Sequence, residues 1–324
     1  MERVIAITVT YNRTRTLERC LTALLNQSRK VDEIIIVDNN SDLEEKERLR
    51  QLTEGQRSIH VLWLDENLGG AGGFEAGMRE CRQTYSVDWY WLMDDDAYPR
   101  EDCLEKLLKA GKKISGAGYL APLIYGVDLD DYQLYHHKYL TGLTYRNEPV
   151  VKRYEELKAV TRIDANAFVG PLISKNAVEK VGIADGSLFI YGDDTEFTFR
   201  VSRKMKSYLV RDAVIDHQDP PFSNNRLDPK AWWKEYYSCR NQYFMIREFQ
   251  TNYLLKMAAY TVLTLGIVRL IVAAILKPKY RGVRFLRVYL LMKSVIDGLC
   301  NRRGKTLDPL EYNKRLKNVK ESRL

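Results

Sequence analysis

The chain has 324 residues, enough for one large domain with an appendage, and with 45% hydrophobic and 29% charged residues its composition is that of a globular protein. Five cysteines without a C-x-x-C spacing indicate neither a zinc site nor a disulfide framework, consistent with a reducing cytoplasm, and we expect no signal peptide. The net charge of +8 is concentrated at the end of the chain, because residues 277–324 hold 14 Lys and Arg against 4 Asp and Glu.

Strand and helix patterns alternate through the first part of the chain. Four short runs rich in β-branched or apolar residues predict strands, and amphipathic or charged segments after each of them predict helices. The strands are 3–10, 33–38, 59–64 and 87–93, and the helices are 17–25, 43–52, 75–84 and 100–112. This order predicts an open, doubly wound α/β domain, in which ligands bind beyond the carboxyl ends of the strands.

Three adjacent carboxylates, Asp94, Asp95 and Asp96, follow the fourth predicted strand. Like charges this close resist joint ionisation, and a hard divalent cation such as Mg²⁺ or Mn²⁺ would relieve the repulsion. In an extended backbone Asp94 and Asp96 point to one side and Asp95 to the other, and we expect Pro99 to stop the strand. The alternative is a solvated acidic turn, which an apolar strand directly in front makes less favourable.

Two further loops fall at the same edge of the predicted sheet. Asp38 ends the second strand, where it could accept a hydrogen bond from uracil or thymine N3–H or simply cap the next helix. The glycine-rich segment 69–73 is not a P-loop, because no Gly-Lys-Ser/Thr follows. It would allow close approach of the backbone to a diphosphate or a sugar, or form a tight turn.

The second half of the chain adds an acidic pair and a histidine. Asp193 and Asp194 open a helix that we expect to run to about residue 204, where acids either complement the helix dipole or supply a general base. His217 ends a predicted strand over 208–215, and it is either structural or the third ligand of an Asp, Asp, His set. Residues 117–165 alternate strand-like segments with turns and predict no definite placement.

The chain changes character after residue 230, and we predict a domain over 1–230 followed by a basic, helical region over 231–324. The apolar stretch 257–276 could just span a bilayer, but Arg269 lies well inside it. We therefore expect this stretch and 283–299 to form amphipathic helices in the membrane interface. The alternatives are a helical cap on the domain, a dimer interface, or a nucleic-acid-binding tail.

Five motifs occur together and in order: TVTYNR at 8–13, IIVDN at 35–39, NLGGAGGF at 67–74, DDD at 94–96 and DDTE at 193–196. On these motifs the chain resembles the family 2 glycosyltransferases of GT-A fold. The glycine loop and the triple Asp are similar to those of the galactofuranosyltransferase-type branch. The resemblance covers about residues 1–218 and implies a Rossmann-like α/β domain with a mostly parallel sheet and a C-terminal helical extension.

The resemblance also implies a role for each candidate residue in an inverting, metal-dependent transfer from a nucleotide sugar. Asp194 would be the catalytic base, and Asp94, Asp96 and His217 would hold Mn²⁺ or Mg²⁺. Donor contacts would come from Thr10, Tyr11, Arg13, Asp38, Gly69, Gly70 and Asp95, with Asp95 facing either the donor or the protein. Acceptor contacts would come from 232–233 and 240–241.

The implied substrates are UDP-galactofuranose and a lipid-linked or cell-surface glycan of bacterial polysaccharide biosynthesis, such as an O-antigen. The acceptor would be polyprenyl-diphosphate-linked, and the protein peripheral on the cytoplasmic face of the plasma membrane. A rhamnosyltransferase using dTDP-rhamnose is the alternative within the same fold. We expect no nucleic-acid partner, since the apolar stretch 257–276 argues against that reading of the basic tail, and homo-oligomerisation stays open.

Overall fold

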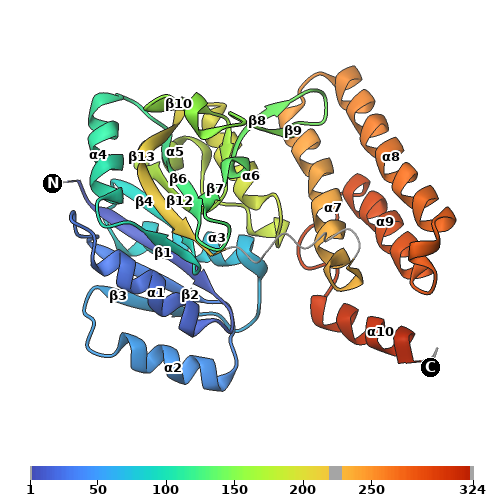
Figure 1. Cartoon of the computed structure of the whole chain (residues 1–324), viewed down its shortest axis with the longest axis horizontal. Coiled ribbons are helices and arrows are strands. Elements are labelled where there is room, and N and C mark those ends of the chain that lie inside the picture. Colours follow the sequence, from blue (N-terminus) through green and yellow to red (C-terminus); the bar gives the residue numbers. More distant parts are fainter. Residues whose placement is uncertain (1, 219–227, 322–324) are drawn as a thin grey trace. The chain divides into compact units, whose positions relative to one another are not determined.

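The computed structural model describes residues 2–218 and 228–321, which form two compact units (Figure 1). Of the described residues, the α/β unit comprises 2–140, 147–186 and 193–218. The helical unit comprises 141–146, 187–192 and 228–321.

The secondary structure elements follow one another in chain order as below. The strands are β1 (Val4–Thr10), β2 (Glu33–Asp38), β3 (Ile59–Trp63), β4 (Trp89–Asp94), β5 (Ala97–Pro99), β6 (Tyr119–Gly126), β7 (Asp131–Tyr132), β8 (His137–Thr141), β9 (Arg146–Pro149), β10 (Val160–Ile163), β11 (Ala165–Asn166), β12 (Val169–Ser174) and β13 (Ser207–His217). The α-helices are α1 (Thr14–Leu25), α2 (Leu43–Thr53), α3 (Gly69–Thr84), α4 (Cys103–Lys113), α5 (Lys175–Val181), α6 (Asp193–Ser202), α7 (Trp232–Phe249), α8 (Tyr253–Leu276), α9 (Arg284–Leu299) and α10 (Pro309–Glu321). Short 3₁₀ helices are η1 (Leu134–His136), η2 (Tyr154–Glu156), η3 (Gly186–Leu188), η4 (Pro229–Ala231) and η5 (Pro278–Tyr280).

The α/β unit is built on a ten-stranded sheet with the order β10-β13-β6-β12-β4-β1-β2-β3, to which β5 and β7 add at the side. Strand β1 is parallel to β2 and β4, while β12 is antiparallel to both β4 and β6. Strand β13 is parallel to β6, so β1, β2, β4, β6 and β13 all run the same way. Their carboxyl ends therefore lie along one edge, which confirms the predicted α/β fold with a mostly parallel sheet.

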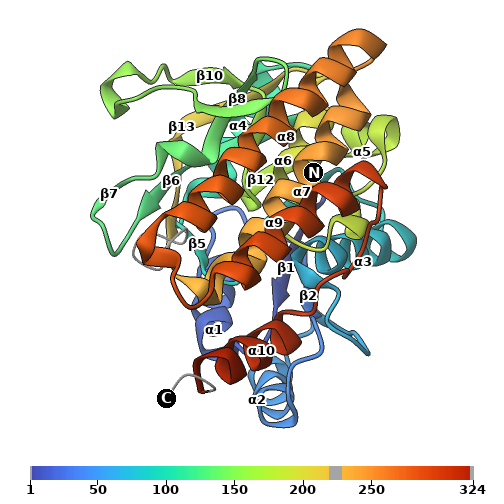
Figure 2. The same cartoon turned by 90° about the vertical axis from the view of Figure 1, so that its right-hand side faces the viewer.

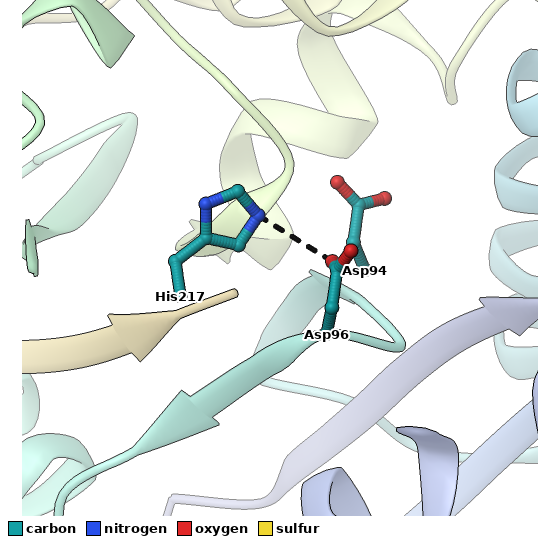
Figure 3. A group of neighbouring side chains, drawn as sticks. All are labelled: Asp94, Asp96 and His217. Atoms are coloured by element: carbon teal, nitrogen blue, oxygen red, sulfur yellow. Dashed lines mark ion pairs between the residues drawn. The ribbon is translucent and has the colours of Figure 1, made fainter. Parts of the chain in front are cut away.

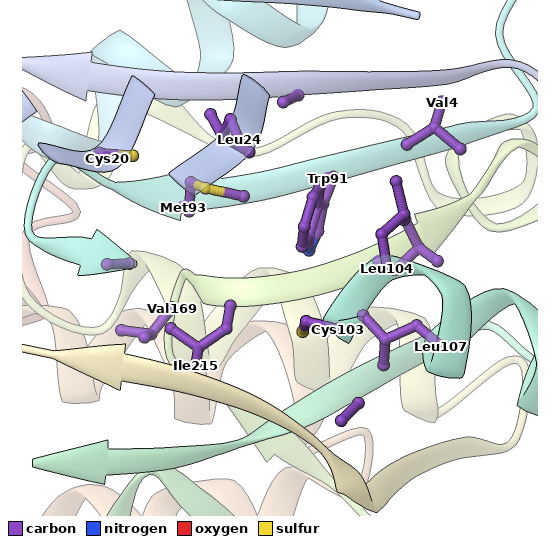
Figure 4. Packing of buried hydrophobic residues seen from close by; sticks show 14 of the residues in the cluster. Val4, Cys20, Leu24, Trp91, Met93, Cys103, Leu104, Leu107, Val169 and Ile215 are labelled. Atoms are coloured by element: carbon purple, nitrogen blue, oxygen red, sulfur yellow. The ribbon is translucent and has the colours of Figure 1, made fainter. Parts of the chain in front are cut away.

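Helices cover both faces of this sheet. Leu17, Leu21 and Leu24 of α1 recur at helical spacing and pack with α4 residues against one face, where Trp91 is fully buried (Figure 4). Helices α3, α5 and α6 contribute buried side chains such as Phe74 to the other face. Burying each large apolar side chain contributes roughly 1.5–3 kcal/mol, so the two layers fix the strand ends firmly.

The glycine-rich segment differs from the predicted loop, because α3 already begins at Gly69. A Cβ atom at Gly73 would lie 2.5 Å from Val9 Cγ1, and one at Gly77 would lie 2.5 Å from Ile7 Cγ2. These glycines let α3 approach β1 closely, which is a packing role. Only Gly69, at φ +73°, and Gly70 lie at the end of α3 that faces the sheet edge.

The acidic triplet also differs from the prediction, in which Pro99 ends an extended segment. Strand β4 ends at Asp94, the chain turns at Asp95 and Asp96, and β5 then pairs antiparallel with β13. Pro99 is tolerated because it ends this three-residue side strand. Because of this turn, the positions of the carboxylates do not follow from alternation along an extended strand. They follow from the pairing of Ala97 with His217.

In the helical unit, α7, α8 and α9 pack on one another, and Figure 2 shows α8 and α9 side by side. The aromatic helix predicted to open at Trp232 is α7, and α8 contains the predicted apolar stretch. Among the described residues, α8 is the helix whose length and composition would allow it to cross a membrane. The residues of α8 that are buried in the folded chain are Ala259, Ile267 and Ala274.

Candidate active site

The carboxyl edge of the sheet gathers most of the residues singled out from the sequence. Thr10 ends β1, Asp38 ends β2, Asp94 ends β4 and His217 ends β13. These strands run the same way, so residues far apart in the chain meet at one edge. The site is therefore a product of sheet topology, as expected for a doubly wound domain.

Asp94, Asp96 and His217 form a compact cluster (Figure 3). Each residue offers one ligand atom, and these atoms all lie within 4.8 Å of one another. His217 Nε2 is 3.4 Å from Asp96 Oδ1. Two carboxylates and an imidazole at this spacing make a donor set that suits a divalent cation such as Mn²⁺.

Arg13 and Thr10 bind carboxylates of the acidic turn at Asp95 and Asp96. The Arg13 guanidinium forms ion pairs with Asp95 at 3.0 Å and Asp96 at 2.8 Å, and the Thr10 hydroxyl donates to Asp95 Oδ2 at 2.8 Å. Asp95 is buried, so of the two orientations expected for it the structure has the one toward the protein. Tyr11, which follows Thr10, is 36% exposed.

The three carboxylates differ in pKa for reasons that follow from these contacts. Burial, with the charges of Asp96 and Asp95, raises the pKa of Asp94 well above its usual value. Burial also raises the pKa of Asp95 to about 7 despite the opposing Arg13 charge. For Asp96, burial is outweighed by His217 and Arg13, and the pKa is lowered. The raised pKa values mean that ionising all three carboxylates gathers more negative charge than their neighbours neutralise, which fits a cation-binding site.

A second acidic pair opens α6. Burial and the neighbouring Asp194 charge raise the pKa of Asp193 to about 7. Asp194 is half-buried, and its Oδ1 accepts from the Thr195 N–H at 2.5 Å and the Thr195 hydroxyl at 3.1 Å. A Cβ at Gly70 would lie 3.9 Å from Asp193 Oδ2, so α3 begins beside this pair.

Asp38 and Asn39 connect the end of β2 to the start of α3. Asp38 is buried, its Oδ2 accepts from the Ser41 N–H at 3.1 Å, and within the described part of the chain its Oδ1 has no hydrogen-bond partner. Asn39 Nδ2 donates to the Gly69 carbonyl at 2.9 Å, which holds the helix start in place. An unpaired buried carboxylate oxygen is costly unless a ligand donor meets it.

Three residues of the site were missed by the sequence analysis. Gln133 accepts from His217, Lys138 Nζ donates to the Thr195 hydroxyl at 2.9 Å, and Asn39 fastens Gly69. Asn39 lies inside a recognised motif and could have been found there. Gln133 and Lys138 lie in the segment that gave no definite pattern, and only the fold places them.

The predicted acceptor contact through residues 240–241 is wrong. Arg240 is 0% and Asn241 2% exposed, and both are used within the helical unit. Arg240 donates to the Gly304 carbonyl at 2.7 Å, and Asn241 Nδ2 donates to the Tyr191 carbonyl at 2.7 Å. They hold backbone segments together, so their polar atoms are not available to a ligand.

Residues 5–182, more than half of the chain, match the family described as Glycosyl transferase family 2. The galactofuranosyltransferase GlfT1 of Mycolicibacterium smegmatis is 32% identical over 206 residues, which are 62% of this chain and 66% of that protein. The match thus spans slightly less than two thirds of the relative's length.

Two solved structures share the fold. GalNAc-T7 with UDP, GalNAc and Mn²⁺ aligns with a TM-score of 0.64 at 14% identity, over 93% of this chain and 58% of that one. The mannosyltransferase PcManGT of Pyrobaculum calidifontis, with GDP-Man and Mn²⁺, aligns with a TM-score of 0.52 at 14% identity, over 93% and 88%. At these identities the likeness is one of fold.

Proposed function

Because the chain belongs to glycosyl transferase family 2 and is a glycosyltransferase of GT-A fold, we propose that it transfers galactofuranose from UDP-galactofuranose to a lipid-linked or cell-surface glycan, with inversion at the anomeric carbon. The observation that carries the proposal is the Asp94, Asp96 and His217 cluster at the carboxyl edge of the sheet, with the Asp193-Asp194 pair close enough to affect the pKa of Asp94.

Asp94, Asp96 and His217 would hold Mn²⁺ or Mg²⁺. When bound, the ion supplies a Lewis acid that stabilises negative charge on the leaving diphosphate. Arg13 keeps Asp96 oriented through one carboxylate oxygen, while the other faces His217. Asp38 supports a uridine or thymidine donor, since its unpaired Oδ1 could accept from the base N3–H.

Asp194 would act on the acceptor. Its carboxylate takes the proton of an acceptor hydroxyl as the hydroxyl oxygen attacks the anomeric carbon from the face opposite the diphosphate. The new glycosidic bond forms as the bond to UDP breaks, so one displacement inverts the configuration. Asp193, whose pKa of about 7 suits proton transfer near neutral pH, is the other carboxylate to test in this role.

A donor screen tests the proposal. Purified protein would be incubated with UDP-galactofuranose, UDP-galactopyranose, UDP-glucose and dTDP-rhamnose, with Mn²⁺ or with EDTA, and release of the nucleotide measured. We expect turnover of UDP-galactofuranose that EDTA abolishes. Turnover of dTDP-rhamnose alone would overturn the donor, and full activity in EDTA would overturn the metal.

We extend the proposal to peripheral membrane attachment through α8 and α9, on the cytoplasmic face, where a polyprenyl-linked acceptor would lie. Exposed apolar residues recur along one side of α9: Phe285, Tyr289, Met292, Ile296 and Leu299. Helix α8 exposes a similar set: Leu254, Leu255, Met257, Val262, Leu265, Val268, Val272, Ile275 and Leu276. So many exposed apolar side chains on one helix pair mark an interaction site.

Charge favours a bilayer as the partner of this surface. Residues 251–296 contain eight Lys and Arg and no Asp or Glu, and of these cations Arg287 and Lys293 are paired with Glu235 and Asp297. Such a surface attracts anionic head groups, whereas two copies facing each other would bring like charges together. We therefore expect lipid contact, with Phe285, which is 84% exposed, among the inserted residues.

Sedimentation with vesicles of anionic or zwitterionic lipid tests this attachment. A Phe285→Glu/Met292→Glu variant should lose at least about tenfold in binding to anionic vesicles, since each burial of a large apolar side chain contributes roughly 1.5–3 kcal/mol. Leu43→Glu is the matched control, because Leu43 on α2 is 83% exposed. Unchanged sedimentation of the double variant, or a wild-type dimer that it dissociates, would contradict lipid contact. Point variants are preferable to deleting 251–324, because α9 packs against α7.

A further inference from the structure

Gln133 lies behind the imidazole of His217. It is 2% exposed, and its Oε1 is 2.9 Å from His217 Nδ1. The opposite ring nitrogen, Nε2, is the one that lies 3.4 Å from Asp96 Oδ1 and belongs to the Asp94, Asp96 and His217 cluster. The two nitrogens of one ring thus face two different partners, one amide and one carboxylate cluster.

With a cation between Nε2 and the carboxylates, this arrangement fits one tautomer of the neutral ring. In neutral imidazole one nitrogen carries the proton and the other a lone pair. The Gln133 carbonyl oxygen can only accept, so it requires the proton on Nδ1 and leaves the lone pair on Nε2. The opposite tautomer would present an N–H to the two carboxylates and could not ligate a cation there.

The surroundings keep Gln133 in this position. Its backbone N–H donates to the Ile124 carbonyl at 2.9 Å, and His136 Nε2 lies 3.1 Å from the same Oε1. A Cβ at residue 126 would lie 2.5 Å from Gln133 Nε2, so Gly126 leaves the space that the amide occupies. The His136 ring packs edge-on against the His217 ring, with centroids 5.4 Å apart.

We infer that Gln133 is a positioning residue that fixes His217 in the Nδ1–H tautomer and thereby makes Nε2 a cation ligand. The inference rests on the proposed metal site, because without a cation the Asp96 carboxylate, which can only accept, favours a proton on Nε2. An outer partner of a ligating histidine typically contributes 10–100-fold to metal affinity.

The experiment uses the full chain with Gln133→Leu, Gln133→Glu and Gln27→Leu. Gln27 is the matched control, since it is a fully buried glutamine in the same unit whose amide bonds backbone groups of Pro99, Arg100 and Leu104. Mn²⁺ affinity is measured by calorimetry in the presence of UDP, and folding of each variant is checked by circular dichroism.

We expect Gln133→Leu to lose about 10–100-fold in Mn²⁺ affinity. Gln133→Glu should keep that affinity, since its carboxylate can still accept from Nδ1–H, and Gln27→Leu should be unaffected. Unchanged Mn²⁺ affinity in Gln133→Leu, or an equal loss in Gln133→Glu, would overturn the inference. A wild type that binds no Mn²⁺ would instead overturn the proposed metal site.

Discussion

The helical unit and the sheet edge of the α/β unit bury charged side chains in opposite ways. In the helical unit, fully buried Asp297 is paired with Lys293 at 2.6 Å and Arg302 at 3.2 Å. Buried Arg287 forms an ion pair with Glu235 at 2.7 Å. In the α/β unit, the buried carboxylates at the sheet edge outnumber the cations beside them, and burial raises the pKa of Asp94, Asp95 and Asp193.

This difference separates structural charge from functional charge. A buried charge that is fully paired contributes to the fold, whereas a buried charge left without enough partners lowers stability and is kept for another purpose. Arg240, whose guanidinium donates to the Gly304 and Leu188 carbonyls, belongs to the first kind, although the resemblance implied a ligand contact. Half-buried Asp94 and buried Asp193 belong to the second.

The largest effect is expected from removing the proposed catalytic base, because this substitution leaves the ion pairs of both units in place. Asp194→Asn should lower the turnover number about 10²–10⁴-fold, the usual contribution of a general base, while UDP binding with Mn²⁺ measured by calorimetry stays within a few-fold. Asp212→Asn, at an exposed acid on β13, is the control and should be active. If Asp194→Asn turned over normally and Asp193→Asn did not, the base would be Asp193.

A smaller effect is expected in the helical unit. The pKa of Asp297 is lowered because Lys293, Tyr236 and Arg302 outweigh its burial. Asp297→Asn should therefore reduce the free energy of unfolding at pH 7 by about 1–3 kcal/mol, the scale of hydrogen bonds to charged groups. The loss should shrink below about pH 4, where Asp297 is protonated in the unfolded wild type. Urea unfolding measures the free energy of unfolding, with Asp308→Asn as a control at a more exposed acid. Equal free energies for Asp297→Asn and wild type at pH 7 would contradict a stabilising role for the ion pairs of Asp297.

At Asp193, removing the charge should increase the free energy of unfolding instead of reducing it. Its pKa of about 7 in the folded chain lies above that of an unfolded Asp, so the folded wild type loses stability as pH rises from about 4 to 7. Asp193→Asn should then be more stable than wild type at pH 8, by up to a few kcal/mol, with the gain fading toward pH 4. Urea unfolding in EDTA at both pH values checks the sign, and a gain that grew on acidification would contradict it.

Local patterns predicted the parallel strands, most helices and the acidic residues of the site, because apolar runs and helical spacing report burial within a single element. They failed at β5, where Asp96 meets His217 through pairing with a strand over a hundred residues later. They also failed at Gln133, since nothing in its own segment shows that it lies behind His217. The glycine segment was misassigned because the same glycines serve a loop or a close helix–strand contact.

The central claim is that the under-neutralised cluster in the α/β unit is a cation site, and that no buried acid of the helical unit is needed for it. Electron paramagnetic resonance counts Mn²⁺ directly, because bound ions lose the six-line signal of the free ion. In the presence of UDP the account predicts one Mn²⁺ per chain for wild type and for Asp297→Asn, and loss of that ion in His217→Ala and Asp94→Asn. Binding that survives His217→Ala and Asp94→Asn, or that disappears in a folded Asp297→Asn, would contradict it.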